Sequence, residues 1–421
     1  MSTTQDLRTF YEEHLHTVLL PFWQRAVDPR HGGVYTCFNN DGTVLVSRDK
    51  YTWSQGRFAW LWSTIARLAQ AGVLSVPAEP FLEQAGRTVA FLRRHAILPN
   101  GNCAYLLTED GTPKEALPGA GHDISFYADC FVIVGFTGYA RGSGDEAALE
   151  DALRLYDHVV ERARSGALRT EPYPIPPGMR AHAVPMILVN VTQELLDLLV
   201  AAGHARAGEM RDRLVGYAED ILATFMQPDG RVAEILPARA EDDDTVLCRH
   251  LNPGHTIEDM GFLLRAAGQT GRTDWIAPAL RAIRKAFDLG WDDDHGGLFR
   301  FVDRDGGPPS GRRFGDRYEQ LILDTWDMKL WWPHAEALYA TLLAHQVTGA
   351  EDMRRLYDRT HAYAFRTFPN PDPEVGEWVQ IRDRSGRPAD RVVALPVKDP
   401  FHILRSVLLI LERLAEEETS R

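Results

Sequence analysis

The sequence predicts an all-α fold, an (α/α)6 barrel (toroid) with short β-hairpins in its connecting loops, built as a single domain over residues 1–421. Two observations lead to this class. A turn motif recurs along the chain at a step of about 65 to 70 residues, which is typical of a repeat architecture. Each turn is followed by a segment that is apolar on more than one face and then by an amphipathic segment. Six such units predict six inner helices ringed by six outer ones.

The repeat is clearest in two turn regions. Residues 31–42 read HGGVYTCFNNDG and residues 295–306 read HGGLFRFVDRDG, and they agree at the histidine, both glycines, an aromatic residue and the closing Asp-Gly. Glycines, alternating apolar residues and an Asp-Gly turn are typical of a short hairpin. Weaker versions of the turn lie at Gly101, Gly166, Gly230 and Gly376. We expect Asp28 and His31 to hold the geometry of the first hairpin.

Helical periodicity gives the bounds of the helices. The predicted inner helices, apolar at i, i+3, i+4 and i+7, cover residues 53–68, 127–140, 184–199, 253–267, 329–343 and 400–414. The predicted outer helices carry more charge and cover residues 79–95, 146–164, 206–226, 274–287 and 350–368. A helix over residues 7–27 supplies the outer partner that the last unit lacks. All inner helices then start at one end of the barrel, where the chemistry should collect.

Composition and charge limit the classes of partner. The chain is 44% hydrophobic and 25% charged, and its net charge of −13 disfavours nucleic acid and anionic membrane surfaces. The four cysteines are far apart and show neither a metal-ligand spacing nor a need for disulfides, which is typical of a reducing compartment. The first residues lack the features of a signal peptide, and no apolar run approaches the length of a bilayer span. We expect a cytoplasmic protein with no nucleic-acid or membrane partner.

Chemically distinctive side chains gather near the starts of the predicted inner helices. They are Trp53, Arg57, Tyr127, Asn190, His255, Glu258, Trp331, Trp332, His334 and His402. Aromatic faces with interspersed hydrogen-bond donors suit a sugar ring, with its apolar CH patches and its hydroxyls. The sequence therefore predicts a pocket for a small sugar at this end of the barrel.

Each of these side chains also has a structural interpretation. Arg57 fits a buried ion pair, Trp331 and Trp332 fit core packing, and a histidine at a helix start fits a bond to a backbone carbonyl. Their grouping at successive helix starts favours a site. His255 and Glu258, three residues apart, would supply half of a metal site, but no second His or Cys stands at a matching spacing. We expect no metal, and a glutamate one turn along can instead orient the imidazole.

Two histidines on different inner helices suit proton transfer at carbon. An unperturbed histidine has a pKa near 6.5, so each can take or give a proton near neutral pH. Placed on opposite faces of a substrate, one removes a proton next to a carbonyl and the other returns one. An arginine near the carbonyl oxygen stabilises the resulting enediolate. This constellation predicts a racemase, an epimerase or an aldose–ketose isomerase.

Several segments resemble the N-acylglucosamine 2-epimerase family. They are residues 53–57 (WSQGR), 184–190 (VPMILVN), 251–258 (LNPGHTIE), 328–336 (MKLWWPHAE), 376–378 (GEW) and 400–402 (PFH). The resemblance runs over nearly the whole chain and implies an (α/α)6 barrel. It also implies an isomerase without a cofactor, in which the sugar ring opens, C2 loses a proton and a cis-enediolate forms. Return of the proton to the other face of C2 gives the epimer, and its return to C1 gives a ketose.

The resemblance implies a role for each candidate residue. His255 and His402 resemble the general acid/base pair. Arg57 resembles the residue at sugar O1/O2, and Glu258 resembles the residue that orients His255. The substrate-binding residues that it implies are Trp53, Tyr127, Asn190, Trp331, Trp332 and His334. It further implies a homodimer.

Differences within the family bear on the substrate. Asn190 stands where cellobiose epimerases and mannose isomerases tend to have a histidine, so the chain is more similar to the N-acylglucosamine branch. Gly261 stands where that branch commonly has a tryptophan, which should enlarge or reshape the pocket wall. Residues 398–403 read KDPFHI in place of the usual Lys-Gly-Cys-Phe-His-Val. The glycine-rich segment that some members use for nucleotide modulation is not evident, so we expect no dependence on ATP.

The sequence thus predicts a sugar 2-epimerase that interconverts N-acetylglucosamine with N-acetylmannosamine, or glucose with mannose. The nearest alternative is an aldose–ketose isomerase of the mannose/fructose type that uses the same two histidines. A glycoside hydrolase on an α/α toroid is an alternative from another class, and it needs two carboxylates beside a glycosidic bond. The carboxylates available to it are Glu258, Asp324, Asp327 and Glu336. A sugar-binding protein without catalysis is a third alternative.

Overall fold

The computed structural model describes residues 4–420, and the chain forms two compact units. The first unit comprises Met1–Pro172, Asn370–Trp378 and Leu395–Arg421, and the second comprises Tyr173–Pro369 and Val379–Ala394. The prediction of one domain over residues 1–421 stays a prediction. Residues 1–3, on which the absence of a signal peptide partly rests, lie outside the described residues.

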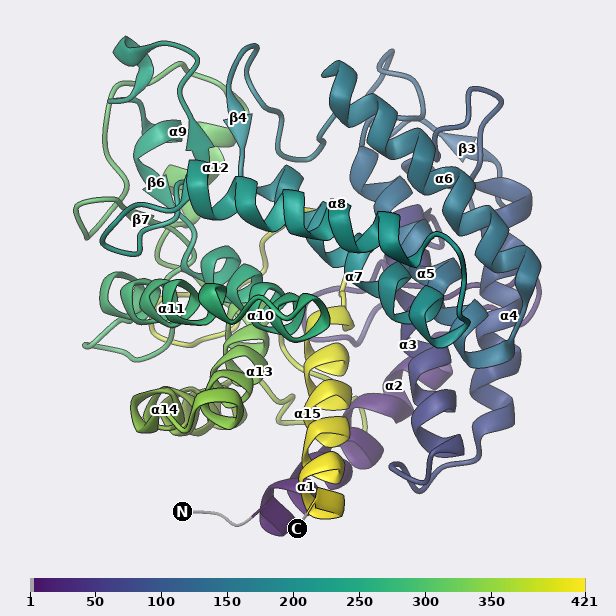
Figure 1. Ribbon diagram of the computed structural model, residues 1–421. Coiled ribbons are helices and arrows are strands. Elements are labelled where there is room, and N and C mark those ends of the chain that lie inside the picture. Colours follow the sequence, from purple (N-terminus) through teal and green to yellow (C-terminus); the bar gives the residue numbers. More distant parts are fainter. Residues whose placement is uncertain (1–3, 421) are drawn as a thin grey trace. The chain divides into compact units, whose positions relative to one another are not determined.

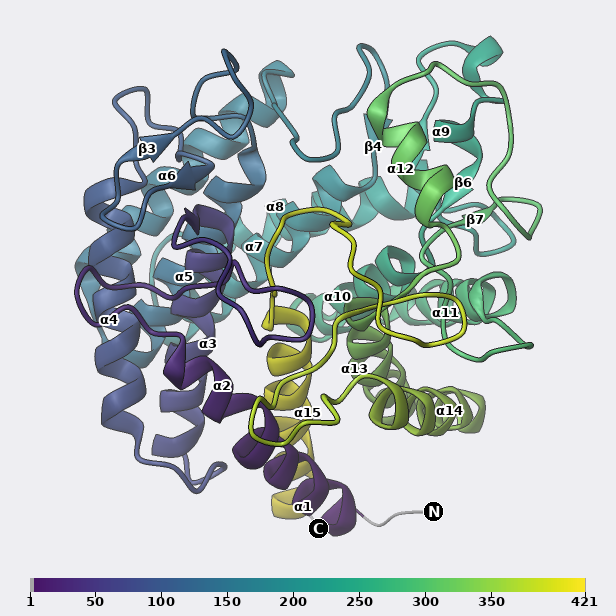
Figure 2. The same cartoon turned by 180° about the vertical axis from the view of Figure 1, so that it is seen from behind.

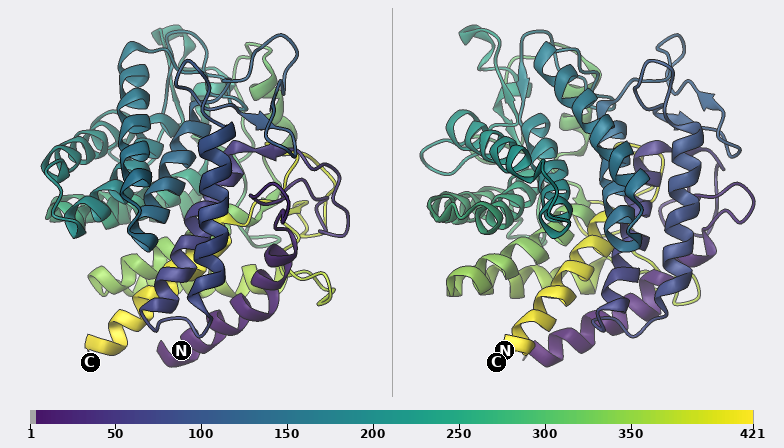
Figure 3. Two further views of the ribbon diagram at one scale, coloured as in Figure 1. Left: turned by 90° about the vertical axis from the view of Figure 1, so that its right-hand side faces the viewer. Right: turned by 45° about the vertical axis from the view of Figure 1, so that its right-hand side comes forward.

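Helices build the first unit. They are α1 (Thr4–His14), α2 (Leu20–Arg25), α3 (Thr52–Gln70), α4 (Ala78–His95), α5 (Phe126–Ser143), α6 (Glu146–Ser165) and α15 (Phe401–Ser420). A π-helical turn at Leu15–Leu19 joins α1 to α2, so the helix predicted over residues 7–27 is one interrupted path. α3 packs against α4, α5 and α15, and the terminal helices α1 and α15 lie side by side (Figures 1 and 3).

Glycines let α3 and α5 approach each other closely. A Cβ atom at Gly56 would collide with the backbone of Phe131, and one at Gly135 would collide with the carbonyl oxygen of Gly56. Both helices are buried over most of their length, whereas α4, which packs against α3 (Figure 2), buries mainly one stripe. This is the predicted difference between an inner and an outer helix.

The second unit repeats this arrangement. Its helices are α7 (Ala183–Ala201), α8 (Ala207–Asp220), α9 (Val246–Arg249), α10 (Pro253–Thr270), α11 (Ile276–Gly290), α12 (Arg317–Thr325), α13 (Trp331–Thr348) and α14 (Glu351–Thr367). α10 packs against α7, α11 and α13, while α8 packs against α7 and α14 against α13 (Figure 1). α7, α10 and α13 are the predicted inner helices. The short helices α9 and α12 lie in connections for which the sequence predicts no helix.

Short antiparallel strands stand directly before inner helices. The pairs are β1 (Lys50–Tyr51) with β2 (Leu106–Leu107), β2 with β3 (Pro113–Lys114), β4 (Arg180–Ala181) with β5 (Ile235–Leu236), β6 (His250–Leu251) with β7 (Val302–Asp303), and β8 (Lys329–Leu330) with β9 (Ile381–Arg382). An inner helix begins within two residues of the end of β1, β4, β6 and β8. The strand pairs therefore fix where these helices start. The helix predicted from residue 329 begins at Trp331 because Lys329 and Leu330 are in β8.

The two matching hairpins each enclose a buried lysine. Nζ of Lys50 lies 2.6 Å from Oδ2 of Asp28, and Nζ of Lys329 lies 3.1 Å from Oδ2 of Asp292. Asp28 also accepts the backbone N–H of His31, which holds the turn in the way that the sequence predicts. The repeat in the sequence therefore encodes a repeated ion pair beneath each hairpin.

One helix corrects an expectation from the sequence. By length and composition alone α7 is able to cross a membrane, because its most apolar stretch has a mean hydropathy of 1.5. The sequence analysis expects no such segment. However, 78% of that stretch is buried inside the protein, because α7 is an inner helix with apolar side chains on every face. Core helices of soluble proteins share these properties, so α7 receives no membrane assignment.

Candidate active site

A buried arginine lies at the centre of a polar group in the first unit. Arg57, on the second turn of α3, has Nη1 2.6 Å from Oδ2 of Asp399 and Nη2 3.4 Å from Nε2 of His402. Its guanidinium is 4.1 Å from the ring centre of Phe131 and 4.8 Å from that of Phe401. Because an arginine offers donors and no acceptor, the contact requires that Nε2 of His402 present a lone pair. A positive charge therefore stands beside an unprotonated ring nitrogen.

Asp399 and Lys398 fix the start of α15. Oδ1 of Asp399 accepts the backbone N–H of Phe401, while Oδ2 of the same carboxylate binds Arg57. Nζ of Lys398 donates to the carbonyl oxygen of Trp378 at 2.6 Å. The departure from the family pattern at residue 399 thus brings a carboxylate to the guanidinium and to the first residue of α15.

Two more of the predicted residues lie beside this arginine. The ring of Trp53 has its centre 5.6 Å from that of Tyr127 and 4.9 Å from the guanidinium of Arg57. Tyr127 is buried at the start of α5, and Trp53 is partly exposed at the start of α3. We call Arg57, Asp399, His402, Trp53 and Tyr127 the Arg57 group.

In the second unit His255 stands at the start of α10. Asn252 caps this helix by accepting the backbone N–H of His255, and Pro253 occupies the first helical position. The cap places Nδ1 of His255 3.0 Å from Oε2 of Glu234, which lies directly before β5. The His255 side chain is 21% exposed and that of Glu234 is 3% exposed. Glu234 fixes Nδ1 and leaves Nε2 as the ring nitrogen for proton transfer.

A second buried histidine lies beyond Glu234. His182 has Nε2 2.8 Å from Oδ2 of Asp259 and Nδ1 3.7 Å from Oε1 of Glu234. Burial opposes the charged ring, but Asp259 and Glu234 overcome it and raise the pKa of His182 to about 10. Burial also opposes ionisation of Glu234, but the charges and hydrogen bonds of His255 and His182 hold its pKa well below the usual range. We call these four residues the His255 chain.

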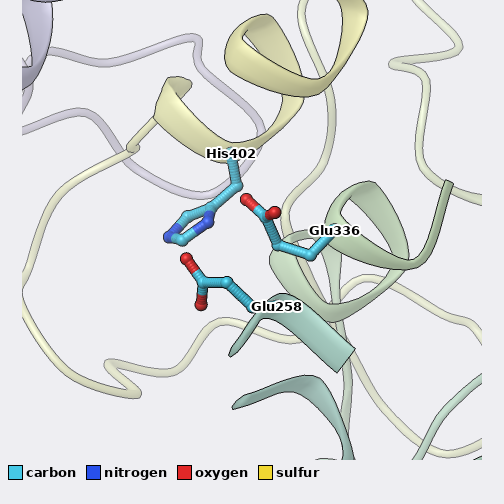
Figure 4. Close-up of side chains that lie close together, drawn as sticks. All are labelled: Glu258, Glu336 and His402. Carbon is cyan, nitrogen blue, oxygen red and sulfur yellow. The ribbon is translucent and has the colours of Figure 1, made fainter. Parts of the chain in front are cut away.

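Two buried glutamates lie near each other in the second unit. Glu258 on α10 and Glu336 on α13 are 7% and 1% exposed, and an oxygen of one lies within 4.8 Å of an oxygen of the other (Figure 4). The carboxylate bonded to Nδ1 of His255 is that of Glu234. The role of Glu258 in orienting His255 stays a prediction.

His334 is bonded to the backbone at both ring nitrogens. Nε2 accepts the N–H of Leu298 at 2.8 Å, so Nδ1 carries the proton that it donates to the carbonyl of Leu330 at 2.6 Å. Burial lowers the pKa of His334 to about 3, which keeps the ring neutral. His334 therefore joins the hairpin before Leu298 to the start of α13. The predicted contact with sugar would require breaking one of these two bonds.

The remaining predicted residues of the second unit differ in their contacts and burial. The ring of Trp332 has its centre 5.1 Å from that of His255, and a Cβ atom at Gly254 would collide with the indole. Trp331 is buried at the start of α13, and Asn190 is buried within α7. Trp332 is therefore the aromatic side chain that this unit places against the imidazole.

Gly261 has a packing role. A Cβ atom at this position would lie 3.3 Å from the Cβ atom of Ala340 on α13, which is tighter than ordinary contact. The glycine allows α10 and α13 to approach each other. The expectation that this glycine enlarges or reshapes the pocket wall stays a prediction.

One surface group resembles a metal site. Ligand atoms of Asp292, Asp294 and His295 lie within 4.8 Å of one another. However, Lys329 and Arg384 already bind Asp292, at 3.1 and 2.8 Å. Because two cations balance this carboxylate, we assign no metal to the group.

Sequence reasoning names both histidines and Arg57 as candidates but does not name Asp399, His182 or Glu234. Asp399 is visible as a departure from the family pattern, and His182 as a histidine at the start of an inner helix. Glu234 carries no such signal, because it lies 21 residues before His255 in a turn region. The structure divides the predicted residues between the units, with Arg57, His402, Trp53 and Tyr127 in the first and the other six in the second.

Known proteins resemble the chain over nearly its whole length. A family model described as N-acylglucosamine 2-epimerase (GlcNAc 2-epimerase) matches residues 33–406. The N-acylglucosamine 2-epimerase of Bos taurus is 32% identical over 405 residues, which cover 94% of this chain and 88% of that protein.

Solved structures resemble the chain as well. A sugar epimerase from a ruminal bacterium has a TM-score of 0.77 at 19% identity, over 97% of this chain and 99% of its own. A D-mannose isomerase has a TM-score of 0.75 at 18% identity, over 96% of this chain and 98% of its own. These structures confirm the predicted fold class, an (α/α)6 barrel.

Proposed function

Because the chain belongs to the N-acylglucosamine 2-epimerase family, we propose that it interconverts an N-acylglucosamine with its C2 epimer, an N-acylmannosamine. The chain is an enzyme of the isomerase class, a sugar 2-epimerase. The observation that carries the choice of substrate is the 32% identity to an N-acylglucosamine 2-epimerase over nearly the whole chain. The bond from Nδ1 of His255 to Glu234 supports the chemistry, because it readies Nε2 to exchange a proton with carbon.

The reaction removes one proton from C2 and adds another to the opposite face, and the electron pair of the C2–H bond moves into the enolate and back to C2. In the open-chain aldose the C2–H bond breaks, its electron pair forms a C1=C2 double bond, and the carbonyl oxygen becomes the enolate oxygen. The proton goes to one histidine, and a second histidine gives a proton to the opposite face of C2. We propose His255 and His402 as this pair. Each is supported by contacts within its own unit.

Arg57 is the proposed partner of the oxygen that gains negative charge. Its guanidinium is flanked by the aromatic rings of Phe131 and Phe401, where the charge of an enolate oxygen would be weakly screened. The 3.4 Å contact between Nη2 and Nε2 of His402 is long for a hydrogen bond, so a sugar oxygen is the better acceptor. Binding of that oxygen then frees Nε2 for proton transfer.

Glu234 is the proposed support for the opposite histidine. When Nε2 of His255 takes a proton the ring becomes an imidazolium, and the buried carboxylate 3.0 Å from Nδ1 offsets the new charge. The ring also keeps its orientation against Trp332 throughout the cycle. In this proposal the imidazolium of His255 is therefore stabilised by the Glu234 carboxylate, and the enolate oxygen is stabilised by the Arg57 guanidinium.

The proposal is tested by proton exchange in D2O. The purified enzyme is incubated separately with N-acetylmannosamine, N-acetylglucosamine, mannose and glucose, and each mixture is followed by proton NMR. We expect deuterium at C2 and the epimeric aldose, fastest for the N-acetylated pair. If none of the four sugars exchanges its C2 proton, the proposed activity is wrong for these substrates.

An aldose–ketose isomerase is the second candidate function. It shares the deprotonated intermediate, and the similarity in fold to a D-mannose isomerase makes it the alternative to test. The two outcomes differ in where the proton returns, because protonation at C1 yields a ketose. Accumulation of fructose from mannose in the same NMR series, without the C2 epimer, would replace the epimerase proposal by this one.

A further inference from the structure

Behind His255 the second unit carries two charged groups that the proposed reaction does not use. His182 and Asp259 are completely buried, and Nε2 of His182 lies 2.8 Å from Oδ2 of Asp259. The backbone holds His182 opposite Glu234, because its N–H donates to the carbonyl of Glu234 at 2.9 Å directly after the pair Ala181–Ile235 of β4 and β5. The two side chains therefore meet through the register of the strands.

The contact between His182 and Glu234 is electrostatic. Nδ1 of His182 and Oε1 of Glu234 are both buried, lie 3.7 Å apart, and have no hydrogen-bond partner among residues 4–420. Buried charges cost free energy, and apolar side chains of similar volume often stabilise a protein as well or better. Stability alone is therefore a poor reason for a buried line of four titratable groups that ends at a proposed catalytic histidine.

We propose that His182, held by Asp259, is a positioning residue that sets the proton affinity of His255 through Glu234. The inference rests on the proposed role of His255 in the reaction. A lone buried carboxylate beside His255 would favour the imidazolium and remove the base near neutral pH. A cation on the far side of Glu234 offsets part of its negative charge. The carboxylate therefore stabilises the protonated form of His255 less.

The charges around the chain are consistent with this role. Across the neutral range His182 keeps its proton, because its pKa is raised to about 10, so it acts as a permanent cation. His250 of β6 also faces Glu234 and His255, and burial lowers its pKa, so it stays neutral near pH 7. The ring of His182 also lies against the uncharged ring of Phe225, at 5.7 Å between ring centres, and the guanidinium of Arg180 lies 5.4 Å from the centre of the Phe225 ring.

A change of His182 to glutamine tests the inference through the pH profile. The variant lacks the cation, so His255 should keep its proton to higher pH. We expect the acid limb of kcat/KM to move up by about one pH unit. His182→Lys restores a cation and should return the limb toward the wild-type position. His361→Gln on α14 is the matched control, because it removes a partly buried histidine of the same unit and should leave the limb in place.

NMR of ring nitrogens in the full chain separates this inference from the proposed function. In the wild type His182 should show protons on both ring nitrogens from about pH 6 to 9, and in His182→Gln the titration of His255 should move to higher pH. If no sugar is turned over while this movement is seen, the proposed function fails and the inference stands. A neutral His182 at pH 7 in the wild type overturns it even where no variant folds. An unchanged titration of His255 in a folded His182→Gln also overturns it.

Discussion

Within its own unit, one of the two histidines proposed for proton transfer contacts a cation and the other contacts an anion. His402, in the Arg57 group, faces a guanidinium through Nε2, and that contact requires a lone pair on the ring nitrogen. His255, in the His255 chain, is bonded through Nδ1 to a buried carboxylate, which can offset the charge of an imidazolium during the reaction. An epimerase that works in both directions needs one base and one acid at the start of each turnover. Because the two roles exchange when the direction reverses, each histidine serves as base for one epimer and as acid for the other.

The two groups also hold their histidines by different means. The Arg57 group uses one ion pair and stacked aromatic rings, and its carboxylate is anchored to the start of α15. The His255 chain uses alternating charges, from imidazole to carboxylate to imidazolium to carboxylate. A guanidinium remains charged at any relevant pH, whereas the members of the His255 chain depend on one another. Changes in the second group should therefore alter pH dependence more than changes in the first.

The largest expected effect comes from removing either histidine. His255→Asn and His402→Asn should each lower the rate of epimerisation by about 10²- to 10⁴-fold, because a general acid or base is lost. If the two histidines act on opposite faces of C2, each variant should lose only one of the two proton exchanges. Each variant should still exchange the C2 proton of the epimer whose proton faces the surviving histidine. Proton NMR in D2O with each epimer separately measures both rates.

The pattern of exchange decides the outcome of that experiment. Complementary patterns, with one variant exchanging one epimer and the second variant exchanging the other, support two histidines on opposite faces of C2. Loss of exchange from the same epimer in both variants would contradict the assignment of two separate faces. In that case a single group would carry the proton in both directions.

The next largest effect is expected for the arginine. Arg57→Lys retains a positive charge but lacks the planar fork that binds Asp399 and a sugar oxygen together, so kcat should fall by about 10²- to 10³-fold. Rates and KM values for both epimers measure the change. A charge-stabilising role predicts a loss mainly in kcat. A loss confined to KM would instead indicate that Arg57 only binds the ground state.

A smaller effect is expected for the carboxylate on His255. Glu234→Gln keeps the shape of the side chain and removes its charge, so activity should fall by about 10- to 100-fold, as for other groups that orient a functional imidazole. The acid limb of the pH profile should also move to lower pH, because the imidazolium loses its countercharge. Glu109→Gln, a surface carboxylate in the first unit, serves as the control and should change neither quantity.

Local patterns in the sequence predict the helices and part of the site. Helical periodicity marks α3, α10 and α13 because a buried helix needs apolar residues at regular spacing. The histidines and Arg57 are found because they belong to short motifs at helix starts.

The partners of these residues depend on contacts between distant segments. The carboxylate of Asp399 reaches a guanidinium 342 positions earlier in the chain, and Glu234 reaches His255 only through the pairing of β4 with β5 and the cap of α10. A single sequence does not show which of its distant residues lie close together in space. It also gives no means to see that both ring nitrogens of His334 are bonded to the backbone.

The smallest expected effect is on protein stability. It concerns His182, which Asp259 and Glu234 keep protonated. The folded pKa of His182 is raised to about 10, against about 6.5 in an unfolded chain. Its contribution to the free energy of unfolding is therefore fully present below about pH 6.5 and is lost as the pH rises through 10. The difference in Tm between the wild type and His182→Gln should be a few °C near pH 6.5 and should shrink toward pH 10. His361→Gln should show no such trend, because burial lowers the pKa of His361 to about 4 and the ring is neutral throughout. A gap for His182→Gln that stays constant from pH 6.5 to 10 would mean that packing, and not charge, is what His182 contributes to stability.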